Sequence, residues 1–331
     1  MATTAADRPP ESGATGAAGW IDVLITGSDI GPDKLAEEAR AISPRVRVTV
    51  LADRAALPAM LAEAEVVAGS VPPALLPHAG RLKWIHSWAA GVAVTPELRD
   101  SPTTLTSSKG NGAIPLAEHV ILLMLMLARR SPEIMQAQRE HRWAKTVHGE
   151  LTGQTLGIIG LGHSGTDLAR KARAFHMRVL GVRRTAQPCA DVDEQFTPQH
   201  LHEFLGRCDW VAMTAPLTPQ TRHMLGEAEF RAMKPSAYYI CISRGATADP
   251  EALLRALSEG WIAGAGLDAH AVEPLPPDSP FWDAPNTIVT PHYGATTPLT
   301  YRRGADIFLQ NLRRYVAGEP LINVVDKEVG Y

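Results

Sequence analysis

The chain has 331 residues, of which 45% are hydrophobic and 20% are charged, and its formal net charge is −3. This composition is typical of an ordinary globular protein, and the length predicts two domains. Because the balance is slightly acidic, the molecule as a whole is not attracted to nucleic acid or to an anionic membrane, and we expect neither as a partner.

The cysteines and the N-terminal segment indicate the cellular setting. Cys189, Cys208 and Cys241 contain no CxxC pair. This spacing predicts neither a disulfide framework nor a zinc site, so no metal is expected and a cytoplasmic location is favoured. Residues 1–18 are rich in small and polar residues and lack the apolar core of a secretory signal, which predicts a disordered tail.

From residue 21 onward, segments with strand character alternate with segments of helical periodicity. The first series predicts strands at 21–26, 46–51 and 66–71, further strands with turns within 82–92 and 103–108, and helices at 32–42 and 55–64. The most apolar run follows at 114–128, interrupted by Glu118 and His119. Its uninterrupted part is too short to span a bilayer, and we interpret the run as a helix buried on all sides.

A second series begins near residue 152. It predicts strands at 155–160, 177–184, 209–215, 238–244, 262–269 and 287–291, helices at 164–175 and 198–208, and a long amphipathic helix at 297–318. Strands that alternate with helices indicate parallel sheets. The expected fold class is therefore α/β, with two doubly wound parallel-sheet domains.

A glycine-rich turn lies between the first strand and the first helix of this second series. Gly160, Gly162 and Gly165 have the GxGxxG spacing, in the strand–turn–helix context that gives this motif its meaning. The first glycine permits a tight turn, the second lets the backbone approach a pyrophosphate, and the third allows close helix–strand packing. With His163 and Ser164, they predict a dinucleotide site at the start of a helix.

The end of the following strand suggests which dinucleotide binds. Arg183, Arg184 and Thr185 stand where a carboxylate usually holds the adenosine ribose, and no Asp or Glu occurs between Asp167 and Asp191. Guanidinium groups offer bidentate donors to a phosphate, whereas a carboxylate would repel one. The pattern favours NADP over NAD, although two solvated arginines and a loosely bound NAD remain possible.

Three ionisable residues fall at or after the ends of strands in the second series: Arg244, Glu273 and His292. Ligands of doubly wound sheets bind beyond the carboxyl ends of the strands, so these side chains are expected to converge. An arginine can hold the carboxylate of a 2-oxo acid, a histidine can donate a proton to its carbonyl oxygen, and a carboxylate can orient the histidine and favour its charged form. Each residue alone has an ordinary structural explanation.

The chain resembles the D-isomer-specific 2-hydroxyacid dehydrogenases, most closely the short glyoxylate/hydroxypyruvate reductases among them. The resemblance runs from about residue 85 to 325. It rests on "KGNGAIPLAEHVILLMLMLAR", "GIIGLGHSG", "MTAPLTPQTRHML", "FRAMKPSAYYICISRGATAD", "AGLDAHAVEPLPPDSPFWDAPN" and "VTPHYGATT", in the order that the family shows.

The resemblance implies roles for individual residues. Arg244 matches the substrate-binding arginine, Glu273 the catalytic acidic partner and His292 the proton donor. Ala90 and Gly91 match a loop whose amides hold the substrate carboxylate. The implied cofactor contacts are Asp268 at the nicotinamide carboxamide, a backbone contact at Ile242, and Pro216 and Thr221 near the adenosine and phosphates.

The family also implies a discontinuous layout. A flavodoxin-like substrate domain would combine residues 19–113 and 296–331, and a Rossmann-type dinucleotide domain, residues 114–295, would be inserted between them. The helix at 114–130 would help to form a homodimer. His163 and Ser164 replace the Arg and Ile that are common in the family's glycine motif, and Arg183 replaces its usual aspartate.

These observations predict an NADP(H)-preferring oxidoreductase that acts on the CH–OH group of a small 2-hydroxy acid or reduces the corresponding 2-oxo acid, with glyoxylate and hydroxypyruvate as the first candidates. Two alternatives stay open. One is a cofactor-sensing regulatory protein on the same scaffold, and the other is a phosphite-type dehydrogenase.

Overall fold

A computed structural model describes residues 19–27, 31–185 and 188–328. The predicted tail at 1–18 lies outside the described residues. The chain forms two compact units, which we call the five-stranded unit and the seven-stranded unit after their sheets. Of the described residues, the former contains those within Met1–Ser87, Thr95–Thr106 and Ile307–Ile322, and the latter contains those within Trp88–Val94, Ser107–Asp306 and Asn323–Tyr331. The functional domain boundaries implied by the resemblance stay a prediction.

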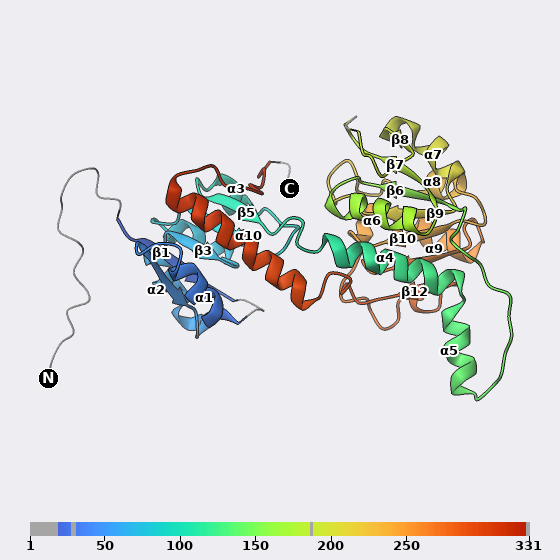
Figure 1. Ribbon diagram of the computed structural model, residues 1–331, viewed down its shortest axis with the longest axis horizontal. Helices are drawn as coiled ribbons and strands as arrows, with labels where there is room; N and C mark the ends of the chain where they lie inside the picture. The colour runs from blue at the N-terminus through green and yellow to red at the C-terminus, as the bar shows by residue number, and fades with distance from the viewer. Residues whose placement is uncertain (1–18, 28–30, 186–187, 329–331) are drawn as a thin grey trace. The chain divides into compact units, whose positions relative to one another are not determined.

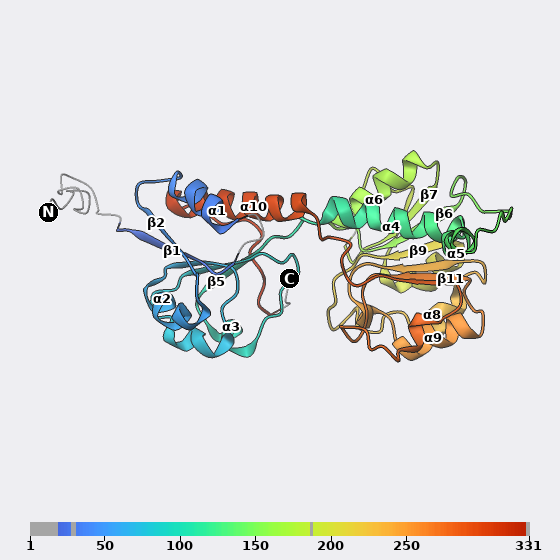
Figure 2. The same ribbon diagram turned by 90° about the horizontal axis from the view of Figure 1, so that it is seen from below.

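The five-stranded unit has the strand order β2-β1-β3-β4-β5. Its strands are β1 (Ile21–Ile25), β2 (Val46–Val50), β3 (Val66–Ala68), β4 (Trp84–Ser87) and β5 (Thr104–Ser107), and its helices are α1 (Pro32–Arg40), α2 (Leu57–Glu63) and α3 (Pro96–Asp100). The pairs β1–β2, β1–β3 and β3–β4 run parallel. Figure 2 shows α1 on one face of the sheet and α2 and α3 on the other.

The last helix, α10 (Pro298–Ala317), brings distant residues to this sheet. The ring of Trp84, on β4, stacks with Phe308 at 5.6 Å between centroids and with Tyr315 at 5.5 Å. Trp84 and Phe308 are fully buried. Stacked aromatic rings add to the free energy gained from their buried area, which explains why the end of the chain belongs to the same unit as its beginning.

The seven-stranded unit has the strand order β12-β11-β10-β9-β6-β7-β8, and all of its strand pairs are parallel. Its strands are β6 (Thr155–Ile159), β7 (Arg178–Val182), β8 (Glu194–Phe196), β9 (Trp210–Met213), β10 (Tyr238–Cys241), β11 (Gly264–Leu267) and β12 (Thr287–Val289). Its other helices are α4 (Ala113–Ala128), α5 (Ser131–Arg139), α6 (His163–Ala174), α7 (Leu201–Arg207), α8 (Glu227–Ala232) and α9 (Pro250–Ser258). The strand order reverses between β6 and β9, where doubly wound sheets bind ligands.

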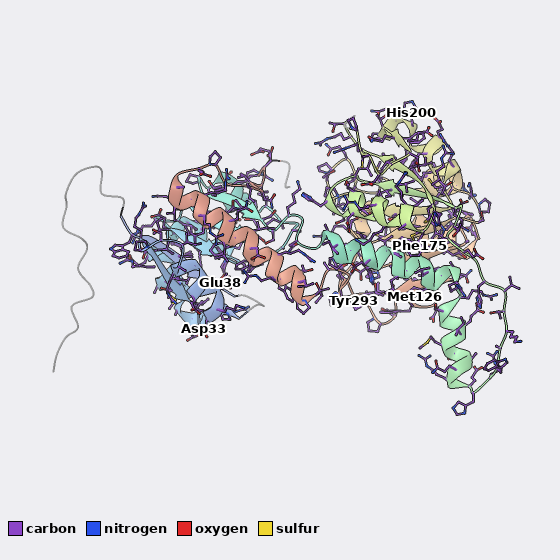
Figure 3. All side chains as sticks on the ribbon, in the orientation of Figure 1. Asp33, Glu38, Met126, Phe175, His200 and Tyr293 are labelled. Carbon is purple, nitrogen blue, oxygen red and sulfur yellow. The ribbon has the colours of Figure 1, made fainter. Side chains whose placement is uncertain are left out.

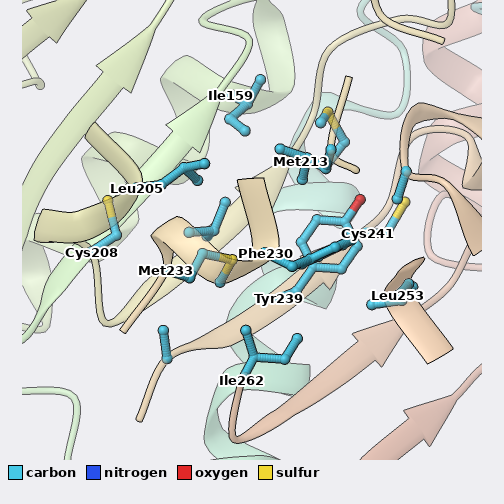
Figure 4. Packing of buried hydrophobic residues seen from close by; sticks show 14 of the residues in the cluster. Ile159, Leu205, Cys208, Met213, Phe230, Met233, Tyr239, Cys241, Leu253 and Ile262 are labelled. Atoms are coloured by element: carbon cyan, nitrogen blue, oxygen red, sulfur yellow. The ribbon is translucent and has the colours of Figure 1, made fainter. Parts of the chain in front are cut away.

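Two apolar layers hold this sheet between its helices. Figures 1 and 2 show α4 and α6 on one face and α8 and α9 on the other. Alternate residues of β10 point into opposite layers: Ile240 packs with residues of α4 and α6, and Tyr239 packs with residues of α7, α8 and α9. Figure 4 shows Tyr239 beside Phe230 and Leu253 in the second layer. Side chains alternate across a strand, so both faces must be apolar here.

The predicted α/β class with two parallel sheets is confirmed, and the elements predicted from periodicity are present with shifts of a few residues at their ends. The elements that were not predicted are β8, α3, α5, α8 and α9. β8, α3 and α8 are short and α5 is polar, so their periodicity is weak, whereas the amphipathic pattern of α9 was overlooked.

One interpretation was wrong. The run at 114–128 does form α4, but it is not buried on all sides. His119, Val120 and Leu123 are buried, whereas Ile114 and Leu122 are exposed. Only one side of α4 packs on α6 and the sheet. Among the described residues, no helix is long and apolar enough to cross a membrane.

Candidate active site

The glycine-rich turn has the geometry that a phosphate requires. Gly160 has a φ of 102°, and a Cβ on it would lie 2.6 Å from the backbone nitrogen of Ala215. A Cβ on Gly165 would collide with the carbonyl oxygen of Gly160. A Cβ on Gly162 would have no atom within 4 Å, so the turn presents open backbone there. Gly160 and Gly165 therefore exclude a side chain by close backbone contacts, whereas Gly162 leaves room for a ligand to approach the backbone, as the motif predicts.

The first turn of α6 completes this feature. Gly162 is its N-cap residue, and no side chain caps the helix. The first amides of a helix have no partner within the helix and carry its positive dipole end. His163 is exposed and Ser164 half-buried beside them. This chain therefore fits the pyrophosphate of a dinucleotide.

The residues predicted to read the ribose follow the neighbouring strand. β7 ends at Val182, Arg183 is half-buried, and Arg184 and Thr185 are exposed. The backbone N–H of Arg183 donates to the carbonyl oxygen of Phe196, at 3.1 Å, which fixes the start of the loop beside β8. β6 and β7 are adjacent, so the arginines lie next to the strand that leads into the glycine turn.

Two other predicted cofactor contacts are held by backbone geometry. The hydroxyl of Thr221 donates to the carbonyl oxygen of Pro216, at 2.6 Å, and closes the loop after β9. Ile242 is buried just after β10, and its N–H donates to Met213, at 3.4 Å. These residues follow β9 and β10, the strands next to β6 on the side opposite β7.

The predicted proton donor and its carboxylate are in direct contact. Nδ1 of His292 lies 2.9 Å from Oε1 and 2.8 Å from Oε2 of Glu273. Both side chains are a little more than one-third exposed. An imidazole whose Nδ1–H donates to a carboxylate has a fixed tautomer, and its Nε2 is then the nitrogen that can reach a substrate.

Glu273 is held in its ionised form. Burial raises its pKa, but the N–H of His270, which donates to Oε1 at 2.8 Å, and the contact with His292 outweigh burial, so the pKa lies below its ordinary value. Glu273 therefore carries its negative charge beside His292 at neutral pH.

The third predicted catalytic residue, Arg244, lies in a loop that packs against the segment leading to Glu273. It is exposed, and its Nη1 donates to the carbonyl oxygen of Ser243, at 2.7 Å. A Cβ on Gly245 would collide with the backbone between His270 and Ala271, so this loop packs directly on the segment that leads to Glu273. Arg244 and Glu273 are thus carried by touching loops.

The predicted substrate loop also meets the arginine. Ala90 and Gly91 are exposed and belong to the seven-stranded unit. A Cβ on Gly91 would lie 2.7 Å from Nη2 of Arg244. A side chain here would displace the guanidinium, so glycine keeps the backbone amides beside it. An amide and a guanidinium side by side form a site for a carboxylate.

Asp268, the predicted carboxamide contact, is bound by several groups of the protein itself. Its carboxylate is fully buried, and it accepts from the hydroxyl of Thr290 at 2.7 Å and from the backbone N–H groups of Tyr293 and Gly294 at 3.1 and 3.0 Å. Burial raises its pKa, but the hydrogen bonds from His119, Thr290 and Gly294 outweigh burial and lower it to about 2. In this structure Asp268 binds the loop that carries His292, and its contact with a carboxamide stays a prediction.

The sequence analysis did not identify His119 and Thr290 as residues of this region. Nε2 of His119 lies 3.1 Å from the hydroxyl of Thr290 and 3.4 Å from Oδ1 of Asp268. The available signal was a histidine within an otherwise apolar helix, because a buried polar group needs a partner. Which partner it has depends on packing that brings positions 119 and 290 together.

Comparisons with known proteins show which family the chain resembles. The family model of the D-isomer specific 2-hydroxyacid dehydrogenase NAD binding domain matches residues 121–294. The chain is 35% identical over 321 residues to glyoxylate/hydroxypyruvate reductase B of Pectobacterium atrosepticum, which covers 89% of this chain and 97% of that protein. It is 34% identical over 275 residues to a glyoxylate reductase of Thermococcus litoralis, covering 80% and 83% respectively.

A solved structure with the same fold is the NADPH-dependent glyoxylate/hydroxypyruvate reductase of Sinorhizobium meliloti, in complex with NADP and sulfate. It has a TM-score of 0.81 and 31% identity, and the match covers 94% of this chain and 100% of that one.

Proposed function

Because the chain belongs to the D-isomer specific 2-hydroxyacid dehydrogenase family, we propose that it reduces a small 2-oxo acid with NADPH, glyoxylate or hydroxypyruvate being the preferred substrates. The family assignment confirms the predicted resemblance and enzyme class, an NAD(P)-dependent oxidoreductase acting on the CH–OH group. The observation that carries the proposal is the contact between His292 and both carboxylate oxygens of Glu273, on a loop that touches the loop of Arg244.

The preference for NADPH is supported by the residues after β7. Arg183 and Arg184 follow the strand next to the glycine turn, where a carboxylate would repel a 2′-phosphate. The similar reductase of Sinorhizobium meliloti is described as NADPH-dependent. We infer that Gly160, Gly162 and Gly165 with the first amides of α6 bind the pyrophosphate, and that the two arginines and Thr185 bind the 2′-phosphate.

The chain's own residues have distinct tasks in the proposed reaction. Arg244 and the amides of Ala90 and Gly91 hold the substrate carboxylate, which orients the carbonyl carbon. Nε2 of charged His292 donates a proton to the carbonyl oxygen, and Glu273 stabilises the charge and orientation of the ring. The reduced nicotinamide, when bound, supplies the hydride that adds to the carbonyl carbon. In the opposite direction His292 accepts the proton of the 2-hydroxyl group.

A kinetic experiment tests the proposal. The loss of NADPH absorbance is measured with glyoxylate, hydroxypyruvate and a panel of larger 2-oxo acids, and phosphite is tested as donor with NADP. We expect turnover of the two small acids, and loss of most activity in His292→Ala with NADPH binding retained. A chain that binds NADPH but reduces none of the acids would support the cofactor-sensing alternative, and oxidation of phosphite alone would support the other.

A charge reversal tests the cofactor preference separately. Arg183→Asp should lower kcat/KM with NADPH and raise it with NADH, because it restores an acceptor for a ribose hydroxyl. Binding of NADPH by the unmodified protein should weaken with salt more than binding of NADH, since charge-assisted contacts are screened. Equal efficiency of the two cofactors in the unmodified protein would contradict our interpretation of residues 183–185.

We also propose a homodimer in the cytoplasm. α5 and the segment after it extend from the seven-stranded unit (Figure 1) and carry exposed apolar side chains. Trp143 is 90% exposed and Val147 is 92% exposed, and Leu122 on α4 is exposed as well. Apolar surface of this kind is typical of a protein interface. The three cysteines are free thiols, which supports a reducing compartment.

A further inference from the structure

We propose that His119, on α4, is a positioning residue for the proton donor: it holds Asp268 and Thr290 in the arrangement that fixes the backbone around His292. The role of His292 as proton donor rests on the proposed function. The claim that His119 stabilises the loop of residues 290–294 rests on the geometry alone. His119 is 171 residues from Thr290 in sequence and belongs to another element.

The backbone of His292 needs external support. Its φ is 52°, in the left-handed region that is unfavourable for a residue with a side chain. Such a conformation persists only where surrounding contacts hold it. Here the contacts come from Asp268, which binds Thr290 on one side of His292 and the amides of Tyr293 and Gly294 on the other.

The hydrogen-bond directions assign a donor to His119. The hydroxyl of Thr290 donates its single proton to Asp268, at 2.7 Å, so in its contact with His119 it can only accept. Nε2 of His119, 3.1 Å from that hydroxyl and 3.4 Å from Oδ1 of Asp268, is in place to donate. The order of donation is therefore from His119 to Thr290 to Asp268.

The residues that follow His292 pack closely against His119 and Asp268, so a change at His119 should alter the conformation of this loop. A Cβ on Gly294 would lie 2.8 Å from Oδ2 of Asp268 and 2.9 Å from Cδ2 of His119, so only glycine allows this approach. The ring of Tyr293 meets the ring of His119 edge-on, with 5.2 Å between centroids, and Figure 3 shows Tyr293 beside α4. Both residues directly after His292 thus contact His119 or its partner.

The titratable groups near His119 lie on α4 itself and on the loops after β11 and β12. Asp268, after β11, is its carboxylate neighbour, while Glu118 on α4 is exposed. After β12, the loop contributes Tyr293 and His292, the latter paired with Glu273. His270 approaches from the other side of Thr290, with Nε2 2.9 Å from its carbonyl oxygen. The low pKa of Asp268, about 2, agrees with an ionised carboxylate that depends on these donors.

The test compares His119→Leu, which removes the donor, with His119→Gln, which keeps an N–H donor. Thr290→Val removes the hydroxyl between His119 and Asp268 without changing the side-chain shape. It replaces His119→Leu in the experiment if that variant does not fold. The matched control is His200→Leu, at an exposed surface position of the same unit. Hydrogen exchange of the amides of Tyr293 and Gly294 is measured in the cofactor-free protein, so this readout does not depend on activity.

We expect His119→Leu and Thr290→Val to speed exchange at these two amides by about tenfold or more, the effect of losing a hydrogen bond to a buried charge. His119→Gln and His200→Leu should stay close to the unmodified protein. With glyoxylate, kcat should fall by about tenfold in His119→Leu while the Kd for NADPH is unchanged. Without the hydrogen bond from His119, the pKa of Asp268 should rise. Asp268 then becomes protonated, and releases the loop of His292, at a higher pH, so the loss of kcat on the acid side should begin at a higher pH.

A purely structural role for His119 would give another result. It would lower the melting temperature of His119→Leu and His119→Gln alike and leave both the pH profile and exchange at Tyr293 and Gly294 unchanged, which would overturn the inference. If the unmodified protein reduces no 2-oxo acid, the proposed function fails, yet the exchange experiment still decides whether His119 holds the loop.

Discussion

Replacement of Asp268 by asparagine should cost the protein about 2 kcal/mol of stability at neutral pH. The carboxylate is fully buried, and its pKa falls from 3.8 to about 2 in the folded protein. A tenfold change in proton affinity corresponds to about 1.4 kcal/mol, so the depressed pKa corresponds to about 2 kcal/mol. Asparagine would also turn an N–H group toward Gly294 or Tyr293, where the structure has donors, which adds to the loss.

The pH dependence has a definite sign. A group whose pKa is lowered by folding contributes its full stability above the unfolded pKa of about 4 and loses it as the pH falls through the folded value. The difference between the unmodified protein and Asp268→Asn should therefore be constant from pH 7 to about 5 and shrink to about half near pH 3.

This difference in stability is measured by urea unfolding. Unfolding is followed by tryptophan fluorescence, to which the buried Trp210 of the same sheet contributes. The control is Asp283→Asn, because Asp283 is an exposed aspartate of the same unit. A surface change of this kind should alter stability by less than about 0.5 kcal/mol. Equal stability of Asp268→Asn and the unmodified protein at pH 7, or a difference that stays constant down to pH 3, would refute the reasoning.

Other changes should have more local effects. Glu273→Gln removes the charge beside His292, and kcat with glyoxylate should fall by about 100-fold with an unchanged Kd for NADPH; a smaller loss than threefold in steady-state kinetics would argue against the pair. Gly162→Ala should keep the melting temperature and weaken NADPH binding, whereas Gly165→Ala should lower the melting temperature itself, since its Cβ meets backbone; calorimetry and cofactor titration separate the two outcomes. Leu122→Arg should leave the fold intact and shift the chain toward monomer in size-exclusion chromatography with light scattering, and an unchanged mass would exclude α4 from the interface.

Local patterns account for the parts of the structure that were predicted correctly. The strand β6, the turn with Gly160, Gly162 and Gly165, and helix α6 follow from periodicity and from glycine's conformational freedom within one short segment. α9 carried a readable start that was overlooked, since the side chain of Asp249 caps it by accepting from the N–H of Ala252. α5, short and polar, offered no comparable apolar pattern.

The sequence by itself determined the α/β class and the position of the glycine turn, and it provided the residues that we propose act on a 2-oxo acid, because each depends on residue types within short segments. The sequence also predicted that these residues converge, but only the tertiary structure decided the contacts that they make. The parallel order of β10, β11 and β12 brings Arg244, Glu273 and His292 to one edge of the sheet, and α4 adds His119 from a distant part of the chain. The sequence also could not predict that α4 is buried on one side only or that Asp268 is fully buried, because the residues that pack against each are set by the contacts of the whole fold.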